Sequence, residues 1–449
     1  MKSVLILGAG ISGLGAAHVL LRHGAKVLIS DLKDSVQDKK EKAALTELGA
    51  QFRFGPQSEE LLAGVDTVVV SPVIPKENPI VQAAFKKNIP VISEVELAYR
   101  VTKAPILAIT GTNGKTTTTT LLGSMVSKSG RPFALAGNLG ISLSREAELV
   151  PPDGIIAAEV SSFQLEFIKS FKPKAAVILN ITPDHLERHH TMEAYVAAKA
   201  RIFENMDEND CLLLNADDSY TPQLKKQAES HTHVCLLSTS HEVEEGAFLK
   251  GDILTLHRKG EEIPLCTTGE LKLKGSQNYE DALAASFLAH EGGVPRDVIV
   301  AVLKEFTSLP NRIEYVRTLR DVEYYNDSKA TNTDAAEKGM SAFGHPVILI
   351  AGGYDKGTPL EEFMGEVKKH TKHLILLGAA ADRFEKAAKA AGVSSIFRVS
   401  SMREAVEKGQ ELAKPGDVVI LSPACSSFDM YHNMEERGMD FKRIVNSLK

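Results

Sequence analysis

The sequence predicts an α/β protein of three domains. These are a Rossmann-like N-terminal domain over residues 1–96, a central P-loop domain over residues 97–308 and a Rossmann-like C-terminal domain over residues 309–449. Apolar runs of strand length alternate with helical patterns along the chain. Two of these runs end in glycine-rich turns that open a helix, one in the N-terminal domain and one in the central domain. A third set of strands, with polar clusters at their ends, fills the last part of the chain.

The composition excludes several classes of partner. The chain is 43% hydrophobic and 24% charged, with a net charge of -6 and no long basic run, so we expect no nucleic acid partner. Its four cysteines lie far apart without metal-ligand spacing, which fits a cytoplasmic protein. No apolar run reaches the ~18 residues that would span a membrane. We therefore expect a cytoplasmic monomer that acts on small molecules.

A glycine-rich turn over residues 8–13 follows the first strand and opens a helix. This is the dinucleotide fingerprint in its usual context, and Asp31 ends the next strand, where an acid that binds a ribose would lie. One interpretation is an NAD-binding domain. The other is that the turn binds a different diphosphate. Ser71 follows a third strand at the same edge of the sheet, so we expect it to line the same crevice.

The central domain opens with the strand and turn of residues 106–116. Backbone N–H groups of the turn, together with the helix dipole, favour a bound phosphate. Lys115 would supply a charge for the outer phosphates, and Thr116 a hydroxyl for a metal ion. The full P-loop pattern has a glycine at position 109, where this chain has Ile109. An ordinary strand-to-helix turn is the alternative.

Two further strand ends of this domain carry candidate metal ligands. Glu159 lies near the end of the apolar strand 155–160, where a carboxylate is costly unless it is paired or metal-bound. His185 follows the predicted strand 175–181 at the same edge of the sheet. A lone histidine there would more often be structural. Together with Thr116, these residues favour a metal site.

Lys199 lies on the apolar stripe of a predicted helix over residues 192–206. Burial of an ammonium lowers its pKa or requires a carboxylate partner. Three interpretations are open. The lysine pairs with Glu187 or Asp184, or it extends its amine to solvent. Alternatively, it is a neutral amine that has captured carbon dioxide, which gives a carbamate ligand for magnesium.

Polar clusters mark the strand ends of the C-terminal domain, at residues 326–332, 352–356 and 422–428. Lys329 and Lys356 place cations at these edges. Such cations would suit a small substrate with two acidic groups, and lysines of solvated loops are the alternative.

Four stretches together resemble the Mur ligases of peptidoglycan synthesis, and the resemblance runs nearly from end to end. They are residues 110–117, 159–165, 180–185 and 326–332. The N-terminal glycine-rich turn and the segment 422–429 are most similar to the members that add D-glutamate. The resemblance implies a ligase that forms a C–N bond. It would use ATP to join UDP-N-acetylmuramoyl-L-alanine to D-glutamate through an acyl phosphate.

The resemblance also implies roles for individual residues. The UDP-linked substrate would contact Gly8, Gly10, Gly13, Asp31, Ser71, Asn138 and Gln164. ATP would contact Gly111, Thr112, Asn113, Gly114, Lys115, Thr116, Thr117, Asn278, Arg312 and Asp327. Two magnesium ions would be held by Thr116 with Glu159 and by His185 with a carbamylated Lys199. D-glutamate would contact Lys329, Thr331, Lys356, Ser427 and Phe428. The catalytic residues would be Lys115, His185 and Lys199.

Four positions depart from the family pattern. Val73 replaces a glycine of that pattern, Gln277 and Asn311 replace histidines, and Asp281 replaces an asparagine. The last three adjoin the expected adenine contacts, so the departures concern nucleotide binding more than the reaction.

Three rival functions remain. The first is another ligase of the same fold, which adds a different amino acid or resembles folylpolyglutamate synthase. The second is an NAD-dependent oxidoreductase, which leaves the second phosphate loop unexplained. The third is a nucleotide-binding module without turnover, which leaves the candidate metal ligands without a role.

Overall fold

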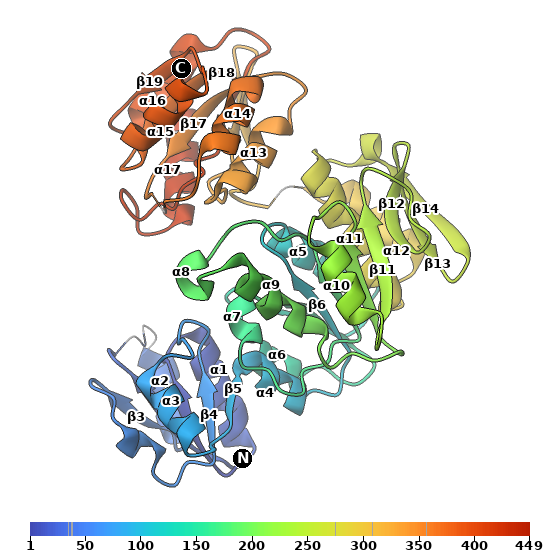
Figure 1. The fold of residues 1–449 in the computed structure, drawn as a ribbon, viewed down its shortest axis with the longest axis vertical. Helices are drawn as coiled ribbons and strands as arrows, with labels where there is room; N and C mark the ends of the chain where they lie inside the picture. Colours follow the sequence, from blue (N-terminus) through green and yellow to red (C-terminus); the bar gives the residue numbers. More distant parts are fainter. Residues whose placement is uncertain (35, 37–38, 274, 308, 356) are drawn as a thin grey trace. The chain divides into compact units, whose positions relative to one another are not determined.

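The structure is a computed structural model that describes residues 1–34, 36, 39–273, 275–307, 309–355 and 357–449. These residues form two compact units. The first comprises Met1–Glu270 and Glu280–Glu305, and the second Leu271–Tyr279 and Phe306–Lys449. The described chain forms three β-sheets, two in the first unit and one in the second (Figure 1). The predicted fold class is confirmed, and the predicted domain boundaries stay predictions.

The first sheet is parallel, with the strand order β3-β2-β1-β4-β5. Its strands are β1 (Ser3–Leu7), β2 (Lys26–Asp31), β3 (Gln51–Phe54), β4 (Thr67–Val70) and β5 (Val91–Ser93). Its helices are α1 (Ile11–Arg22), α2 (Lys39–Glu47), a 3-10 turn (Glu59–Leu62), α3 (Pro79–Lys86) and α4 (Glu94–Val101). The order reverses between β1 and β4, and ligands bind at such a switch point, beyond the carboxyl ends of the strands.

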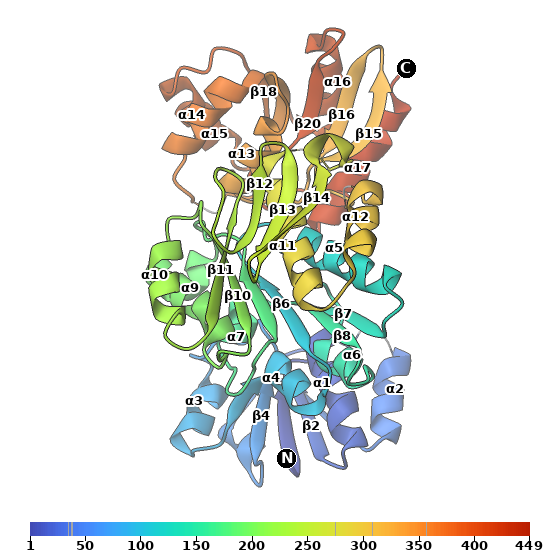
Figure 2. The ribbon, with the colours of Figure 1, turned by 90° about the vertical axis from the view of Figure 1, so that its right-hand side faces the viewer.

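The second sheet has nine strands in the order β14-β13-β12-β11-β10-β9-β6-β8-β7 (Figure 2). They are β6 (Ile106–Thr110), β7 (Phe133–Gly137), β8 (Ile155–Glu159), β9 (Ala175–Ile178), β10 (Cys211–Asn215), β11 (His233–Ser238), β12 (Gly246–Lys250), β13 (Ile253–Arg258) and β14 (Glu261–Thr267). Strands β7 to β12 pair in parallel, and β12 to β14 form an antiparallel meander. Strand β6 lies between β8 and β9, so the loop that follows it stands at the centre of the parallel part.

The helices that accompany this sheet follow its strands in chain order. They are α5 (Lys115–Lys128), α6 (Leu143–Ala147), α7 (Ser162–Leu165), α8 (Leu186–His189), α9 (Met192–Ala200), α10 (Thr221–Ala228), α11 (Ser276–Glu291) and α12 (Arg296–Glu305), with 3-10 turns at Arg201–Phe203 and Thr268–Glu270.

Two predicted elements of this region are shorter than expected. Strand β9 ends at Ile178 because the N–H of Ile181 bonds to the carboxylate of Asp218 at 2.6 Å instead of to a strand. The helix predicted over residues 192–206 ends at Ala200, and a 3-10 turn follows in which Glu204 N–H bonds to Arg201. Hydrophobic periodicity reveals neither the bond to Asp218, 37 positions away, nor the 3-10 turn.

The third sheet belongs to the second unit and has the order β15-β16-β20-β17-β18-β19. Its strands are β15 (Glu314–Leu319), β16 (Val322–Asn326), β17 (Val347–Gly352), β18 (Thr371–Leu377), β19 (Ile396–Arg398) and β20 (Val418–Leu421). Its helices are α13 (Thr333–Ser341), α14 (Glu361–His370), α15 (Ala381–Ala390), α16 (Met402–Leu412) and α17 (Met434–Ser447). Strands β17 and β20 are fully buried, as expected where helices cover both faces of a parallel sheet. No helix in the described ranges is long and apolar enough to cross a membrane.

Glu96 fixes helix α4 to the segment between α7 and β9. Its buried carboxylate accepts hydrogen bonds from the backbone N–H groups of Lys169, Ser170 and Phe171 at 2.8–2.9 Å. It also accepts from the Ser170 hydroxyl and pairs with Arg100. Burial alone would raise the pKa of Glu96, but these donors outweigh it and hold the pKa below its ordinary value. The carboxylate thereby joins the region of the first sheet to that of the second.

We predict that Glu96→Ala destabilises the protein by about 3 kcal/mol, because three backbone donors and one arginine would lose a charged acceptor. The control is Glu47→Ala at an exposed position of α2. Thermal melting of both variants at neutral pH is the measurement. Equal midpoints for the two variants would contradict the role of Glu96. Its contribution to stability is lost only as the pH falls through its lowered pKa.

Candidate active site

The loop between β6 and α5 has a backbone that only glycine adopts readily. Gly111 and Gly114 have φ values of 152° and 87°. A Cβ at Gly114 would lie 2.2 Å from Oδ1 of Asp281, an atom that also accepts from the Thr118 hydroxyl at 3.0 Å. Ile109 lies inside β6 and is fully buried, so position 109 belongs to the strand and not to the loop.

Asn180, which follows β9, holds this loop in place. Its carbonyl oxygen accepts from the N–H of Thr112, and its side-chain oxygen accepts from the N–H of Asn113, both at 2.8 Å. Lys115 opens helix α5, and its Nζ donates to the carbonyl oxygens of Gly111 and Thr112 at 2.9 and 2.8 Å. A cation and the N-terminus of a 14-residue helix therefore meet at one loop, which is an anion-binding arrangement.

Glu159 ends strand β8 and pairs in register with Ile109 of β6, which places it beside the loop. Its side chain is 2% exposed. One carboxylate oxygen accepts from the Asn138 amide at 2.8 Å, whereas the other is buried without a hydrogen-bond partner among the described residues. A buried carboxylate oxygen without a donor fits a hard cation such as magnesium. Thr116, the predicted second ligand, is half-buried in the first turn of α5.

Lys199 is 1% exposed in helix α9, so the interpretation that its amine reaches solvent is wrong. Its Nζ donates to the carbonyl oxygen of Gly111 at 2.6 Å and lies 4.5 Å from the ring centroid of Tyr195. Burial, and then the charge of Lys115, lower the pKa of Lys199 well below its ordinary value, while Asp184 acts in the opposite direction. This environment favours the neutral amine.

His185 precedes helix α8 in a left-handed conformation with φ 54°. Its side chain is 41% exposed, and its ring stands edge-on to Phe163 at 4.9 Å. The Tyr195 ring lies 6.4 Å from that of His185 and also contacts Lys199, so the predicted ligands of the second metal ion border one aromatic ring.

Three residues of this site escaped the sequence analysis: Asn180, His189 and Tyr195. His189 is buried, and its Nε2 lies 3.0 Å from the Ser162 hydroxyl. Burial, followed by the charges of His185 and Lys199, lowers the pKa of His189 to about 4, so its ring is neutral near pH 7. The available signal was helical spacing, since His189 follows His185 by four positions and Tyr195 precedes Lys199 by four.

A cavity of about 450 Å³ lies at the carboxyl ends of β1 and β4. It is lined by six of the residues predicted for the UDP-linked substrate, namely Gly8, Gly10, Asp31, Ser71, Asn138 and Gln164. The seventh, Gly13, packs against the first turn, because a Cβ there would lie 2.0 Å from the carbonyl oxygen of Gly8. Asp31 accepts from the N–H of Ala9 at 2.8 Å and so fixes the turn.

In the second unit, Arg437 joins two of the predicted polar clusters. Its buried guanidinium donates to Ser328 and to the carbonyl oxygens of Cys425 and Ser426 at 2.8–3.3 Å. Sequence reasoning missed this arginine because it lies in helix α17, away from both clusters in the chain. Its contacts make one polar surface from segments about 100 positions apart.

The remaining predicted residues of this unit differ in exposure. Ser427 and Asn278 are buried, Lys329, Thr331 and Arg312 are half-buried, Phe428 is 69% exposed, and Lys356 lies outside the described residues. Asp327 is buried and accepts from the Ser422 hydroxyl at 2.7 Å and from the Ile313 N–H at 3.2 Å. Burial raises the pKa of Asp327 to about 7. The Nε of Arg312 is buried and has no hydrogen-bond partner within the described ranges.

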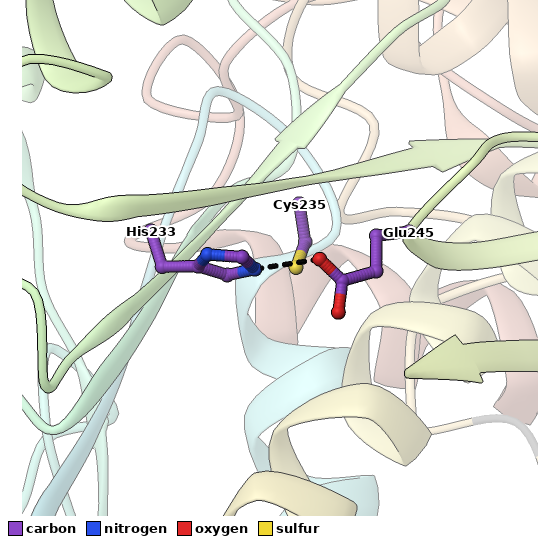
Figure 3. Close-up of side chains that lie close together, drawn as sticks. All are labelled: His233, Cys235 and Glu245. Carbon is purple, nitrogen blue, oxygen red and sulfur yellow. Dashed lines mark hydrogen bonds and ion pairs between the residues drawn. The ribbon is translucent and has the colours of Figure 1, made fainter. Parts of the chain in front are cut away.

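A second set of potential metal ligands lies on β11 and before β12, formed by His233, Cys235 and Glu245 (Figure 3). Nη1 of Arg258 lies 2.9 Å from Nε2 of His233 and 2.8 Å from Oε1 of Glu245. Arg258 is held there by an ion pair with Glu291 at 2.7 Å. Because a guanidinium cation already contacts two of the three donors, this cluster is a poor place for a metal ion.

The fold and this site define a class: a P-loop protein of α/β architecture with a phosphate-binding loop beside a buried carboxylate and a buried lysine. Three family models cover most of the chain. They are the Mur ligase MurD-like N-terminal domain at residues 2–93, the Mur ligase middle domain at 109–289 and the Mur ligase glutamate ligase domain at 311–425. The chain belongs to the Mur ligase family.

Curated relatives match the chain over its full length. The chain is 43% identical over 448 residues to the UDP-N-acetylmuramoylalanine--D-glutamate ligase of Pelotomaculum thermopropionicum, covering 100% of this chain and 98% of that protein. It is 44% identical over 450 residues to the protein of the same name from Thermoanaerobacter sp., covering 100% and 99%. The crystal structure of MurF from Acinetobacter baumannii superposes with a TM-score of 0.64 at 17% identity, covering 98% of this chain and 93% of that one, which supports the fold.

The raised pKa of Asp327 predicts a stability of the second unit that depends on pH. A carboxyl group whose pKa is higher in the folded state binds more protons when folded. Its contribution is therefore lost as the pH rises from its ordinary pKa of 3.8 to about 7. We expect the melting midpoint to fall between about pH 5 and about pH 8, and to fall less in Asp327→Asn.

Scanning calorimetry at both pH values is the measurement. Asp382→Asn is the control, because the side chain of Asp382 is 83% exposed. A fall of equal size in the wild type and in Asp327→Asn would contradict the prediction.

Proposed function

We propose that this chain is an ATP-dependent ligase that joins D-glutamate to UDP-N-acetylmuramoyl-L-alanine, with release of ADP and phosphate, in the synthesis of peptidoglycan precursors. The observation that carries the proposal is the full-length identity of 43–44% to relatives named for that activity. The phosphate loop and the buried Glu159 and Lys199 supply the chemistry that such a ligase requires. The N-terminal glycine-rich turn then serves the UDP part of the substrate and not NAD.

Each of the three domains contributes mainly to one ligand in this scheme. Residues 1–96 bind the UDP-linked substrate around Gly8, Ser71 and Asp31, and Asn138 and Gln164 of the central domain complete that cavity. Residues 97–308 bind ATP, and residues 309–449 bind D-glutamate and contribute ATP contacts.

Lys115 is the residue that meets the ATP phosphates. Its ammonium is bonded to two carbonyl oxygens of its own loop, and on binding ATP it exchanges them for phosphate oxygens. The carboxylate of the UDP-linked substrate attacks the γ-phosphate, which gives an acyl phosphate and ADP. This step brings anions together, so the charge of Lys115 and the helix N-terminus stabilise its transition state.

Two magnesium ions would be held by Thr116 with Glu159 and by His185 with a carbamate on Lys199, and they would offset phosphate charge. The orphan oxygen of Glu159 supports the first position. The buried amine of Lys199, whose lowered pKa favours the form that captures carbon dioxide, supports the second.

The amino acid is bound by the polar surface around Ser328 and Arg437. Lys329, Thr331, Lys356, Ser427 and Phe428 are the proposed contacts. The deprotonated amine of D-glutamate attacks the acyl carbon, the C–N bond forms and phosphate leaves. The contribution of the protein to this second step is positioning.

The proposal includes a cytoplasmic monomer. The four cysteines of the chain are buried free thiols, which fits a reducing compartment.

The reaction predicts phosphate release that depends on D-glutamate. With ATP, magnesium and UDP-N-acetylmuramoyl-L-alanine present, D-glutamate should support release, whereas L-glutamate, L-lysine and meso-diaminopimelate should not. A coupled phosphate assay is the measurement. Release with a different amino acid would favour another ligase of this fold. Tight binding of NAD that UDP does not displace would favour the oxidoreductase.

The carbamate predicts that Lys199→Ala is inactive and that a short carboxylate restores part of the activity, because the added anion replaces the lost oxygen ligand. The matched control is Lys225→Ala on the exposed face of α10, which should keep full activity. Steady-state rates with and without formate or acetate test this. Full activity of Lys199→Ala, together with an unmodified lysine mass in the wild type, would contradict it.

A further inference from the structure

Arg188 connects two segments that lie far apart in the sequence. It lies in helix α8, three positions after His185, and its side chain is 13% exposed. Its Nη1 donates to the carbonyl oxygen of Val73 at 3.3 Å, and its Nη2 donates to that of Ile74 at 3.1 Å. The same guanidinium donates twice to Glu166, at 3.2 and 2.7 Å. One planar group therefore binds a carboxylate and two backbone carbonyls.

One of the two carbonyls that Arg188 binds, that of Val73, belongs to the wall of the N-terminal cavity, and that of Ile74 follows it directly in the chain. Ser71, Pro72 and Val73 line that cavity after β4 ends. The Val73 side chain is 75% exposed, so packing of this side chain does not hold the segment. Its position depends on the turn bond from Ile74 N–H to Ser71, on packing of the half-buried Ile74 side chain against the core of the first sheet, and on the two bonds from Arg188.

On its other side, Arg188 contacts Phe163, the aromatic ring against which His185 packs. The guanidinium carbon lies 4.8 Å from the ring centroid of Phe163, and the His185 ring stands edge-on to Phe163 at 4.9 Å. Phe163 lies in α7, shortly after Glu159 ends β8. Contacts therefore run without a break from the cavity wall through Arg188 and Phe163 to His185.

We propose that Arg188 is a positioning residue that couples occupancy of the N-terminal cavity to the orientation of His185. This inference rests on the proposed function, in which the cavity binds the UDP part of the substrate. When the cavity fills, the segment at residues 71–74 is held more firmly. Arg188 passes that constraint to the Phe163 ring, and the His185 turn becomes ordered before the reaction.

Arg201 offers a matched control. It lines the same small cavity as Arg188, beside Glu166 and His189. Its hydrogen bonds go to the carbonyl oxygens of Glu166 and Ile168 and to the carboxylate of Glu204. This arginine is more exposed than Arg188, at 30% against 13%, and it contacts the backbone of Glu166 without the cavity wall as a partner.

Hydrogen–deuterium exchange of the full chain tests the coupling, with uridine 5′-diphosphate as the probe because it lacks the reacting carboxyl arm. In the wild type and in Arg201→Met, the probe should slow exchange about fivefold in peptides that cover residues 71–78 and also in those that cover 185–190. In Arg188→Met, the protection should remain at 71–78 and disappear at 185–190. If Arg188 only stabilised the fold, its replacement would not remove the protection of residues 185–190 while leaving that of residues 71–78.

Protection of 185–190 that persists in Arg188→Met, or that disappears equally in Arg201→Met, would overturn the proposal. If Arg188→Met does not melt cooperatively, Arg188→Lys replaces it, because one ammonium cannot reach Glu166 and both carbonyls together. If the probe protects neither segment of the wild type, the nucleotide assignment of the cavity fails. The coupling is then judged without ligand. Arg188→Met must speed exchange in both segments, and Arg201→Met in neither.

Discussion

The carbonyl oxygen of Gly111 is the interaction on which the site depends. It accepts hydrogen bonds from two lysine amines, Nζ of Lys115 at 2.9 Å and Nζ of Lys199 at 2.6 Å. Burial of Lys199 and the charge of Lys115 beside it both lower the pKa of Lys199. Asn180 holds the loop in place beside these two lysines. The same oxygen therefore holds both lysine amines at the loop, one at the start of helix α5 and one in helix α9.

The contrast with the cluster of His233, Cys235 and Glu245 shows how charge balance decides between sites. That cluster has more of the usual metal-ligand types than the neighbourhood of Glu159, yet a guanidinium already lies against its nitrogen and oxygen donors. Glu159 instead has one buried oxygen that accepts no hydrogen bond from the part of the chain that the structure describes. The number of potential ligands is therefore a weaker guide to a metal site than the charge on those ligands that no neighbouring group balances.

Local patterns predicted much of this fold, and contacts between distant segments account for what they missed. Helical spacing placed Lys199 on an apolar stripe, and the structure buries it; strand and turn chemistry located the phosphate loop. The edge strand β3 has only a short signal, since two polar residues alternate with Phe52 and Phe54 over four positions. Arg437, Asn180 and Arg188 act on segments far from them in the sequence, so their roles arise only when the chain is folded. Binding at the candidate metal ligands depends on the charges and hydrogen-bond partners around them, which hydrophobic periodicity does not encode.

The close packing of Gly114 against Asp281 has a consequence for how this protein can change. Asp281, which we expect beside the adenine, also accepts from the Thr118 hydroxyl and fills the space over Gly114. A substitution of Asp281 therefore also alters the contacts of the turn between β6 and α5. One position thus has two effects, and a substitution there that changes base preference would call for compensating changes in helix α5.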